Sequence, residues 1–222
     1  FLEKIENLKA LAPSFIPKII DFGIANKSSA LFLVSEQIEG NAWGKQSLSD
    51  TQKWDLINQL VNAIEHYHGL GFAHGDLHPD NIVVSTSNDE LTLFLIDTPD
   101  FCLDSEEPKN NKYSPENIDY CSSFERDIFA TMRLSCELLG ITWGSDSSDY
   151  PAISRAISVE KEDSDFGFRD LSRFKTALEN PSSELDNELD MKTISLRGTF
   201  EPIVIYPDNG QLFVHIDEKA SK

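Results

Sequence analysis

The chain has 222 residues and a mass of 25.0 kDa, which is room for one large domain or two small ones. Its composition is ordinary for a globular protein, with 40% hydrophobic and 26% charged residues. Nineteen Lys and Arg oppose 38 Asp and Glu, a formal net charge of −19. Such a surface repels phosphate backbones and anionic lipid, so we expect neither nucleic acid nor membrane as a partner.

The cysteines indicate the cellular compartment of the protein, and the first residue indicates how much of the parent chain the sequence represents. The three cysteines, Cys102, Cys121 and Cys136, show no CxxC spacing, which indicates reduced thiols in a cytoplasmic protein. The sequence starts at Phe1, with no initiator Met or signal segment. We therefore expect a piece of a longer product, with the other domains of that parent chain among its partners.

The first 40 residues predict a helix and a hairpin. Residues 1–11 place Phe1, Ile5, Leu8 and Leu11 on one face, which is typical of an amphipathic helix. Two extended runs, 15–25 and 30–40, are separated by a short polar stretch and favour a β-hairpin.

A long helix and a second hairpin are expected next. Ser47 and Ser49 are the candidate N-caps of the helix, which continues to about residue 70. The apolar runs 82–84 and 91–97 flank a polar stretch, 85–90, which we expect to be the turn of a small hairpin.

The second half of the chain is expected to be mainly helical. Apolar periodicity predicts helices over residues 125–140, 151–158 and 168–179. An acidic linker, 182–190, then leads to a hairpin over 199–217. This order of elements predicts an α+β fold, with a small mixed part before a mainly helical part.

The densest polar cluster is HGDLHPDNIVV, residues 74–84. Asp76 and Asn81 lie there between a helix and a strand, and Asp97 follows the next apolar strand. Hard oxygen ligands of this kind suit Mg²⁺, which shares its coordination shell with substrate phosphates. A remaining carboxylate can accept a hydroxyl proton. Together these are the groups that phosphoryl transfer requires.

The cluster resembles the catalytic loop of the protein-kinase superfamily. The resemblance implies that Asp76 is the catalytic base, that His74 anchors the loop, and that Asn81 and Asp97 bind Mg²⁺. His78 is a further candidate catalytic residue. Protein kinases usually carry Lys at its place, whereas aminoglycoside- and choline-kinase-like enzymes often read HGDLHxxN. The acceptor therefore stays open between a protein and a small alcohol.

Other motifs follow in the order of the family. Residues 31–40 resemble the strand and hinge that hold the adenine of ATP, which implies these ATP-binding candidates: Ser35 (gatekeeper), Glu36, Gln37 and Ile38. Residues 113–116 resemble the APE motif, in which Glu116 would pair with an Arg such as Arg169. Residues 127–140 resemble the buried helix whose first residue, Asp127, ties back to the catalytic loop.

The sequence also departs from the family pattern. The Gly-rich loop and its partner Lys are expected upstream of residue 1, so the fragment alone is expected to be inactive. Glu3 is the candidate partner of that Lys, although Lys4 occupies the register position. Gly75 replaces the Arg that receives activation-loop phosphate, so switching by phosphorylation is not expected.

Three places in the sequence bear on the Asp-Phe-Gly motif of the family. At the metal-binding position the chain reads Asp97-Thr98-Pro99, which keeps the carboxylate and stiffens the turn. The literal Asp-Phe-Gly strings at 21–23 and 165–167 do not follow the catalytic loop at the required spacing, and we assign both to structure.

The resemblance implies a protein kinase-like fold lacking most of its N-lobe. We expect an N-lobe remnant with hinge at 1–46, a C-lobe at 47–183, and an acidic linker with a β-hairpin extension at 184–222. The implied function is an ATP- and Mg²⁺-dependent protein Ser/Thr kinase-like phosphotransferase. The alternatives are a small-molecule phosphotransferase and a pseudokinase that binds nucleotide as an interaction module.

Overall fold

The structure is a computed structural model, and its two units can be described separately. It describes residues 2–25, 30–88, 90–98, 111–115, 121–162, 171–183, 204–208 and 211–215. The chain divides into two compact units, Phe1–Glu184 and Leu185–Lys222. The expected internal boundary between 46 and 47 stays a prediction.

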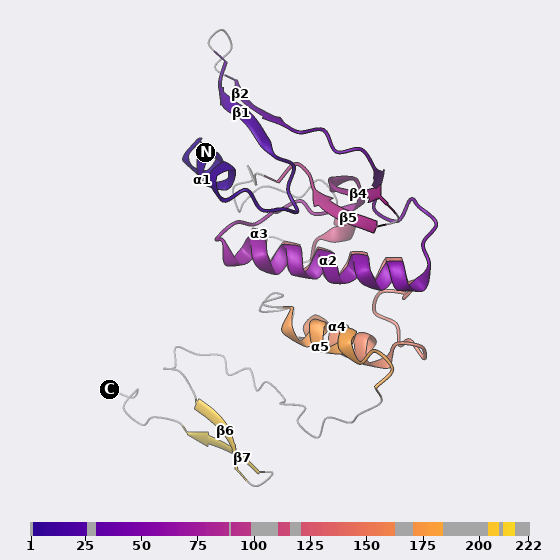
Figure 1. Ribbon diagram of the computed structural model, residues 1–222. Helices are drawn as coiled ribbons and strands as arrows, with labels where there is room; N and C mark the ends of the chain where they lie inside the picture. The colour runs from indigo at the N-terminus through magenta and orange to yellow at the C-terminus, as the bar shows by residue number, and fades with distance from the viewer. Residues whose placement is uncertain are drawn as a thin grey trace, which may run out of the picture. The chain divides into compact units, whose positions relative to one another are not determined.

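The first unit begins with helix α1 (Leu2–Leu11) and a two-stranded antiparallel sheet, β1 (Ile19–Ile24) and β2 (Leu31–Ser35), which projects beside the helix (Figure 1). Ile5 and Leu8 are buried, as the periodicity predicts. Leu11, expected on the same face, is instead 49% exposed, because the helix ends there and the backbone turns at Ala12 with φ +44°.

The long helix α2 (Asp50–Gly69) begins at a capping box. The hydroxyl of Ser49 accepts a hydrogen bond from the Gln52 amide at 3.3 Å, and the Gln52 side chain accepts one from the Ser49 amide at 2.9 Å. Two otherwise unpaired donors at the helix start are thereby satisfied. Ser49, rather than Ser47, is the N-cap.

A three-stranded antiparallel sheet lies on α2, in the order β3 (Asn41–Ala42), β4 (Ile82–Ser87) and β5 (Glu90–Leu95). The expected hairpin is present with different bounds: β4 continues to Ser87 instead of residue 84, and β5 begins at Glu90 and ends at Leu95 instead of residue 97. Of the predicted turn 85–90, Ser85, Thr86, Ser87 and Glu90 pair across the hairpin. Asn88, at φ +51°, makes the reversal, a conformation that Asn tolerates better than most residues.

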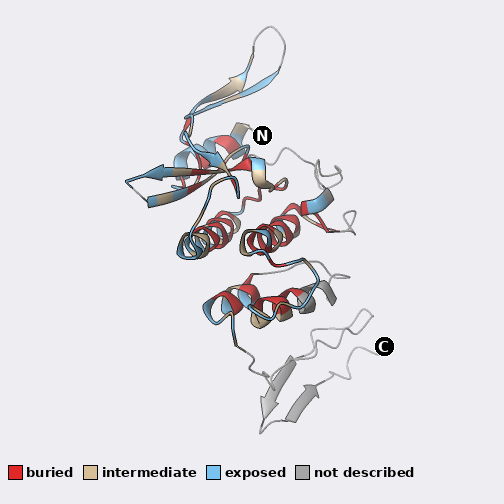
Figure 2. Cartoon of the chain, turned by 90° about the vertical axis from the view of Figure 1, so that its right-hand side faces the viewer, coloured by how far each residue is buried: buried red, intermediate tan, exposed pale blue. Residues whose placement is uncertain are grey.

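The helical part consists of α3 (Ser123–Leu139), α4 (Pro151–Glu162) and α5 (Ser172–Glu179). Gly140 ends α3 in the left-handed region at φ +76°. Helices α2 and α3 pack against each other with their buried faces inward (Figure 2), and α4 packs on α5. None of the described helices combines the length and apolar character needed to cross a bilayer.

The described thiols of this unit are unpaired. Cys121 and Cys136 are both buried and form no disulfide. Burial raises the pKa of the Cys136 thiol to about 12. That thiol is therefore protonated at neutral pH and is no nucleophile.

The second unit contains one described element, an antiparallel hairpin of β6 (Val204–Asp208) and β7 (Gln211–His215). The hairpin predicted over 199–217 is present within these shorter bounds.

The contact of Gly40 with β4 gives a first test of the fold. A Cβ at Gly40 would lie 2.4 Å from the Val84 carbonyl oxygen and 2.8 Å from Val83 Cγ1. Because the nearer atom is backbone, Gly40→Ala is expected to destabilise the chain by about 1–3 kcal/mol through overpacking. Gly69 at the end of α2 meets nothing within 4 Å. Gly69→Ala is the matched control, expected to leave stability unchanged or raised in urea unfolding. Equal midpoints for both variants would contradict the contact.

Candidate active site

The loop that follows α2 is fastened to the start of α3. The Asp127 side chain is fully buried, and its two carboxylate oxygens accept hydrogen bonds from the His74 amide at 2.7 Å and the Gly75 amide at 2.8 Å. The ring of His68 on α2 lies 3.0 Å from the same carboxylate. The link expected between Asp127 and the catalytic loop is confirmed, and it also reaches back to α2.

A second set of bonds joins this loop to the residue before Asp97. His74 Nε2 lies 2.9 Å from the Ile96 carbonyl oxygen, and the Ile96 amide donates to the Asn81 carbonyl oxygen at 2.9 Å. Asp97 follows directly with φ +55°, in the left-handed region. Both main-chain groups of Ile96, the residue between β5 and Asp97, are thus bonded to the loop.

Within the loop, the side-chain nitrogen of Asn81 is hydrogen-bonded and its side-chain oxygen is available. Its Nδ2 donates to the Asp76 carbonyl oxygen at 2.9 Å, and the side chain is largely buried. Because the nitrogen is committed, the amide oxygen is the atom left to bind a ligand. An amide oxygen is a suitable Mg²⁺ ligand.

The side chains of Asp76 and His78 face each other. His78 Nε2 lies 3.8 Å from an Asp76 carboxylate oxygen, and both side chains are partly exposed. His78 Nδ1 accepts a hydrogen bond from the Asp80 amide at 3.3 Å. With Nδ1 engaged in this way, Nε2 is the ring nitrogen that faces Asp76.

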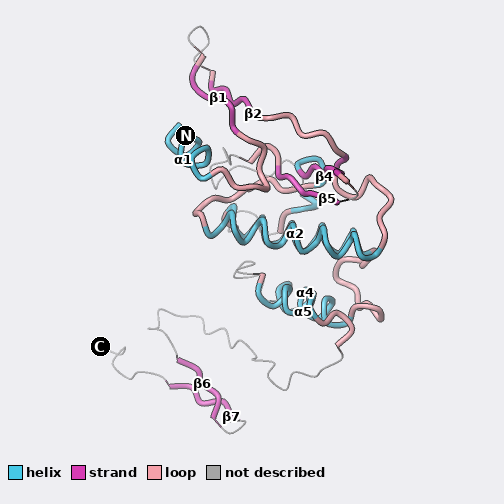
Figure 3. Tube along the Cα trace, in the orientation of Figure 1, coloured by secondary structure: helices cyan, strands magenta, loops and turns pink. Residues whose placement is uncertain are grey.

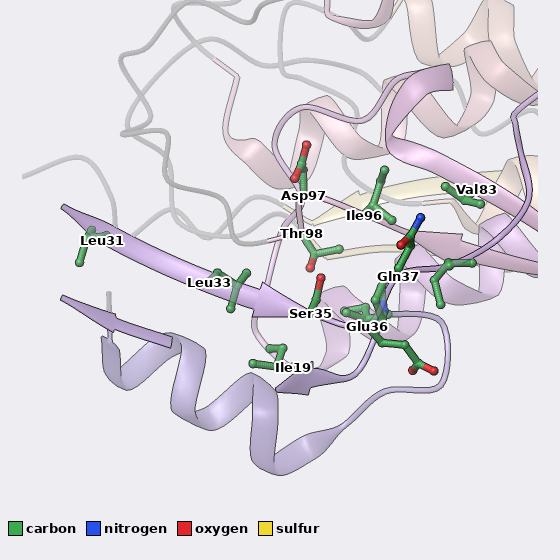
Figure 4. Close-up of a pocket in the computed structure, with 13 residues that line it drawn as sticks. Ile19, Leu31, Leu33, Ser35, Glu36, Gln37, Val83, Ile96, Asp97 and Thr98 are labelled. Carbon is green, nitrogen blue, oxygen red and sulfur yellow. The ribbon is translucent and has the colours of Figure 1, made fainter. Parts of the chain in front are cut away.

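A cavity of about 530 Å³ lies between β2 and the end of β5. Its wall includes the hinge candidates Ser35, Glu36, Gln37 and Ile38, and opposite them Val83, Ile96, Asp97 and Thr98. Figure 4 shows Leu31, Leu33 and Ser35 along β2, with Ile96, Asp97 and Thr98 coming from a separate segment. The structure thus brings the four hinge candidates and Asp97 to one cavity.

The remaining candidate site residues do not line this cavity. His74, Asp76, His78 and Asn81 are not among the cavity-lining residues; they lie in the loop that is bonded to Ile96 (Figure 3 traces this loop from α2 to β4). Glu3 is exposed on α1 and does not line the cavity either.

Two metal-ligand candidates fit Mg²⁺ by donor type. Asp97 offers a carboxylate and Asn81 an amide oxygen, and Mg²⁺ completes such sets with water and phosphate oxygens. Within the described part of the chain, no group of three His, Cys, Asp or Glu side chains is placed to hold a metal by itself. A metal site here would therefore need further oxygens, from water or from a bound ligand.

Several motif residues lie outside the described residues, namely Pro99, Glu116, Arg169 and the 165–167 string. The other Asp-Phe-Gly string, 21–23, lies in β1, as assigned.

Two residues that were not predicted from the sequence also contribute to the candidate site. The Tyr67 hydroxyl donates to the Thr98 carbonyl oxygen at 2.7 Å, and the buried side chain of Arg126 reaches the Gly75 carbonyl oxygen. The sequence offers no local signal for Arg126, because the polar Ser123 and the charged Asp127 stand beside it in the same helix.

Known proteins resemble this chain in sequence over part of its length. No family model matches the chain. GFS12 of Arabidopsis thaliana is 28% identical over 158 residues, 59% of this chain and 10% of that protein. A probable myosin light chain kinase of Dictyostelium discoideum is 30% identical over 101 residues, 43% of this chain and 25% of that protein. The chain thus spans between a tenth and a quarter of the length of these relatives.

Solved structures share the arrangement more extensively. The PknI kinase domain of Mycobacterium tuberculosis matches with a TM-score of 0.58 at 15% identity, over 82% of this chain and 77% of that one. Rad53 in complex with AMP-PNP matches with a TM-score of 0.51 at 20% identity, over 80% of this chain and 49% of that one. The chain is therefore a protein kinase-like domain in its fold.

Proposed function

We propose that this chain belongs to an ATP- and Mg²⁺-dependent phosphotransferase that acts on Ser or Thr hydroxyls of a protein. The observation that carries the proposal is the position of Asp97. Asp97 stands at a cavity wall opposite the hinge candidates, in a left-handed conformation directly after Ile96, whose carbonyl and amide are bonded to the candidate catalytic loop. Backbone strain of this kind persists where the surrounding structure enforces it, often at functional sites.

The cavity suits a nucleotide. One wall is apolar, from Ile19, Leu31 and Leu33, and the segment 35–38 adds main-chain and polar groups. A cavity of a few hundred Å³ with few polar groups is typical of small-ligand sites. Asn81 and Asp97 would hold Mg²⁺, which neutralises phosphate charge when bound. The AMP-PNP complex of the similar Rad53 structure supports a nucleotide as the ligand.

Asp76 would orient the acceptor hydroxyl and accept its proton. It is partly exposed, so an acceptor can reach it, while its main chain is fixed by Asn81. His78 Nε2, 3.8 Å from the Asp76 carboxylate, would help to orient that carboxylate. General base catalysis of this kind contributes about 10²–10⁴-fold.

The acceptor class has one competing candidate. His78 takes the place at which protein kinases usually carry Lys, and its ring faces Asp76 directly. That arrangement favours a small alcohol, as in small-molecule kinases. The relatives' names favour protein: two are called myosin light chain kinases and two serine/threonine-protein kinases. A pseudokinase that binds nucleotide without transfer is the third outcome.

Asp97→Asn tests the metal role. Asn tolerates the left-handed backbone and keeps the shape of the side chain, so the change removes charge with little strain. We expect Mg²⁺-dependent ATP binding, measured by titration calorimetry on the full-length protein that contains this chain, to weaken at least tenfold.

Asp80→Asn is the matched control, because Asp80 lies exposed in the same loop and contributes only its amide to the bond with His78. Its ATP affinity is expected to equal that of the wild type. Unchanged affinity in Asp97→Asn would contradict the assignment.

A further inference from the structure

Arg126 is a buried charge beside the candidate catalytic loop. It is 2% exposed and lies in the second turn of α3, next to Asp127. Its Nε donates to the Gly75 carbonyl oxygen at 3.2 Å, and its Nη2 donates to the Ser123 hydroxyl at 3.0 Å. Its Nη1 is buried and has no hydrogen-bond partner among the described residues.

Burying a guanidinium costs several kcal/mol unless its surroundings compensate. Within the described residues no ion pair joins Arg126 to a carboxylate, since the oxygens of Asp127 are bonded to His68, His74 and Gly75. The partners of Arg126 are one main-chain carbonyl and one hydroxyl. A residue kept only for packing would be less costly as an apolar side chain of similar volume.

The carbonyl that Arg126 contacts belongs to the peptide between Gly75 and Asp76. The amide of the same glycine is bonded to Asp127. Two consecutive residues of α3 therefore hold both hydrogen-bonding groups of Gly75. Gly75 has φ +76°, and glycine is the residue with the most conformational freedom to lose. The side chain of Asp76 starts from the peptide that this pair of bonds fixes.

We propose that Arg126 is a positioning residue that sets the orientation of the Gly75–Asp76 peptide and, through it, the Asp76 carboxylate. The inference rests on the function proposed above. Arg126 does not touch the reacting atoms; it acts through the carbonyl of Gly75. A misplacement of about 1 Å at a reacting group can cost about 10²-fold in rate. Arg126→Met keeps most of the buried volume and removes the donors, so it is expected to lower kcat about 10²-fold while KM for ATP stays unchanged.

The hydrogen bond itself can be observed without any activity. The dipeptide Gly-Asp occurs once in the sequence, at 75–76. In a sample labelled with [1-¹³C]glycine and [¹⁵N]aspartate, each Gly-Asp peptide gives one carbonyl-to-amide correlation in an HNCO spectrum, and this chain contributes only that of Gly75–Asp76. We expect the Gly75 carbonyl signal to move upfield in Arg126→Met, because the carbonyl loses a charged donor.

Two further variants keep the test decisive. Arg133→Met, on the same helix, removes an Arg that bonds Glu137 at 3.3 Å, and is expected to leave the Gly75 signal unmoved. Arg126→Lys keeps the charge and most of the stem but loses the planar fork, and it serves if the Met variant does not fold. Both its carbonyl signal and its kcat are expected to lie between wild type and Met.

Chemical rescue separates positioning from folding. In Arg126→Ala, millimolar guanidinium ion is expected to restore kcat and the Gly75 carbonyl shift together. An unmoved carbonyl signal in Arg126→Met, or a moved signal with full kcat, overturns the proposal. If the wild-type protein transfers no phosphate, the proposed function itself fails, and the carbonyl signal alone then decides whether Arg126 holds the loop.

Discussion

Replacing Asp127 by alanine is expected to lower the melting temperature of the chain by about 10 °C. Its carboxylate is fully buried and accepts from the amides of His74 and Gly75 and contacts the His68 ring. Removing it leaves those donors buried without a partner. Breaking a buried charged network in this way costs about 3–5 kcal/mol, and each kcal/mol shifts the melting temperature of a chain this size by about 2–4 °C.

Asp146→Ala is the matched control for scanning calorimetry, since Asp146 is exposed in the loop after α3. Its melting temperature is expected to stay within about 2 °C of the wild type, because surface changes usually cost less than about 0.5 kcal/mol. A similar small shift for Asp127→Ala would mean that the loop is held by other contacts, and the link between α3 and the catalytic loop would be only geometric.

Asp76→Asn is expected to lower kcat about 10²–10⁴-fold, the usual contribution of a positioned general base. The amide has the same shape as the carboxylate but cannot accept the hydroxyl proton. The main-chain carbonyl that Asn81 contacts is unaffected by the change. Affinity for Mg²⁺-ATP is therefore expected to equal that of the wild type, so the loss should appear in kcat alone.

Asp80→Asn, which changes a residue four positions after Asp76 in the same loop, is again the control variant. We expect it to keep full turnover. Steady-state kinetics of the full-length protein, with calorimetric titration of Mg²⁺-ATP, measure both quantities. Full turnover by Asp76→Asn would assign Asp76 a structural role.

The sequence predicted the helices well, because each presents a periodic apolar face to the core. Ser49 was one of the two predicted N-caps of α2, and the helix predicted to end at 140 does end at Gly140. The strand β3 was missed, because two residues carry no periodicity; its pairing with β4 is a tertiary contact. The polar stretch 85–90 was assigned to a turn because its composition is turn-like, yet side chains on an exposed hairpin can be polar without loss.

Candidate site residues could be predicted where they belong to a recognisable sequence motif, and could not where their role arises from tertiary packing. Asp76 and Asn81 stand in one short motif and Asp97 follows the next apolar strand, so residue types and their order indicated these candidates, whose roles stay predictions. Arg126 was missed, since nothing in a linear pattern shows that its guanidinium points to Gly75 instead of to solvent. Glu3 was inferred from register with the family, and the structure leaves it exposed on α1, away from the cavity wall.

The most direct test of the account is phosphate transfer from [γ-³²P]ATP by the full-length protein, with Mg²⁺ and with EDTA, beside its Asp76→Asn variant. The account predicts Mg²⁺-dependent label on Ser or Thr of protein that disappears in the variant. Label found only on a small alcohol would keep the site chemistry and replace the acceptor. Mg²⁺-ATP binding without any transfer, in wild type and variant alike, would contradict the account.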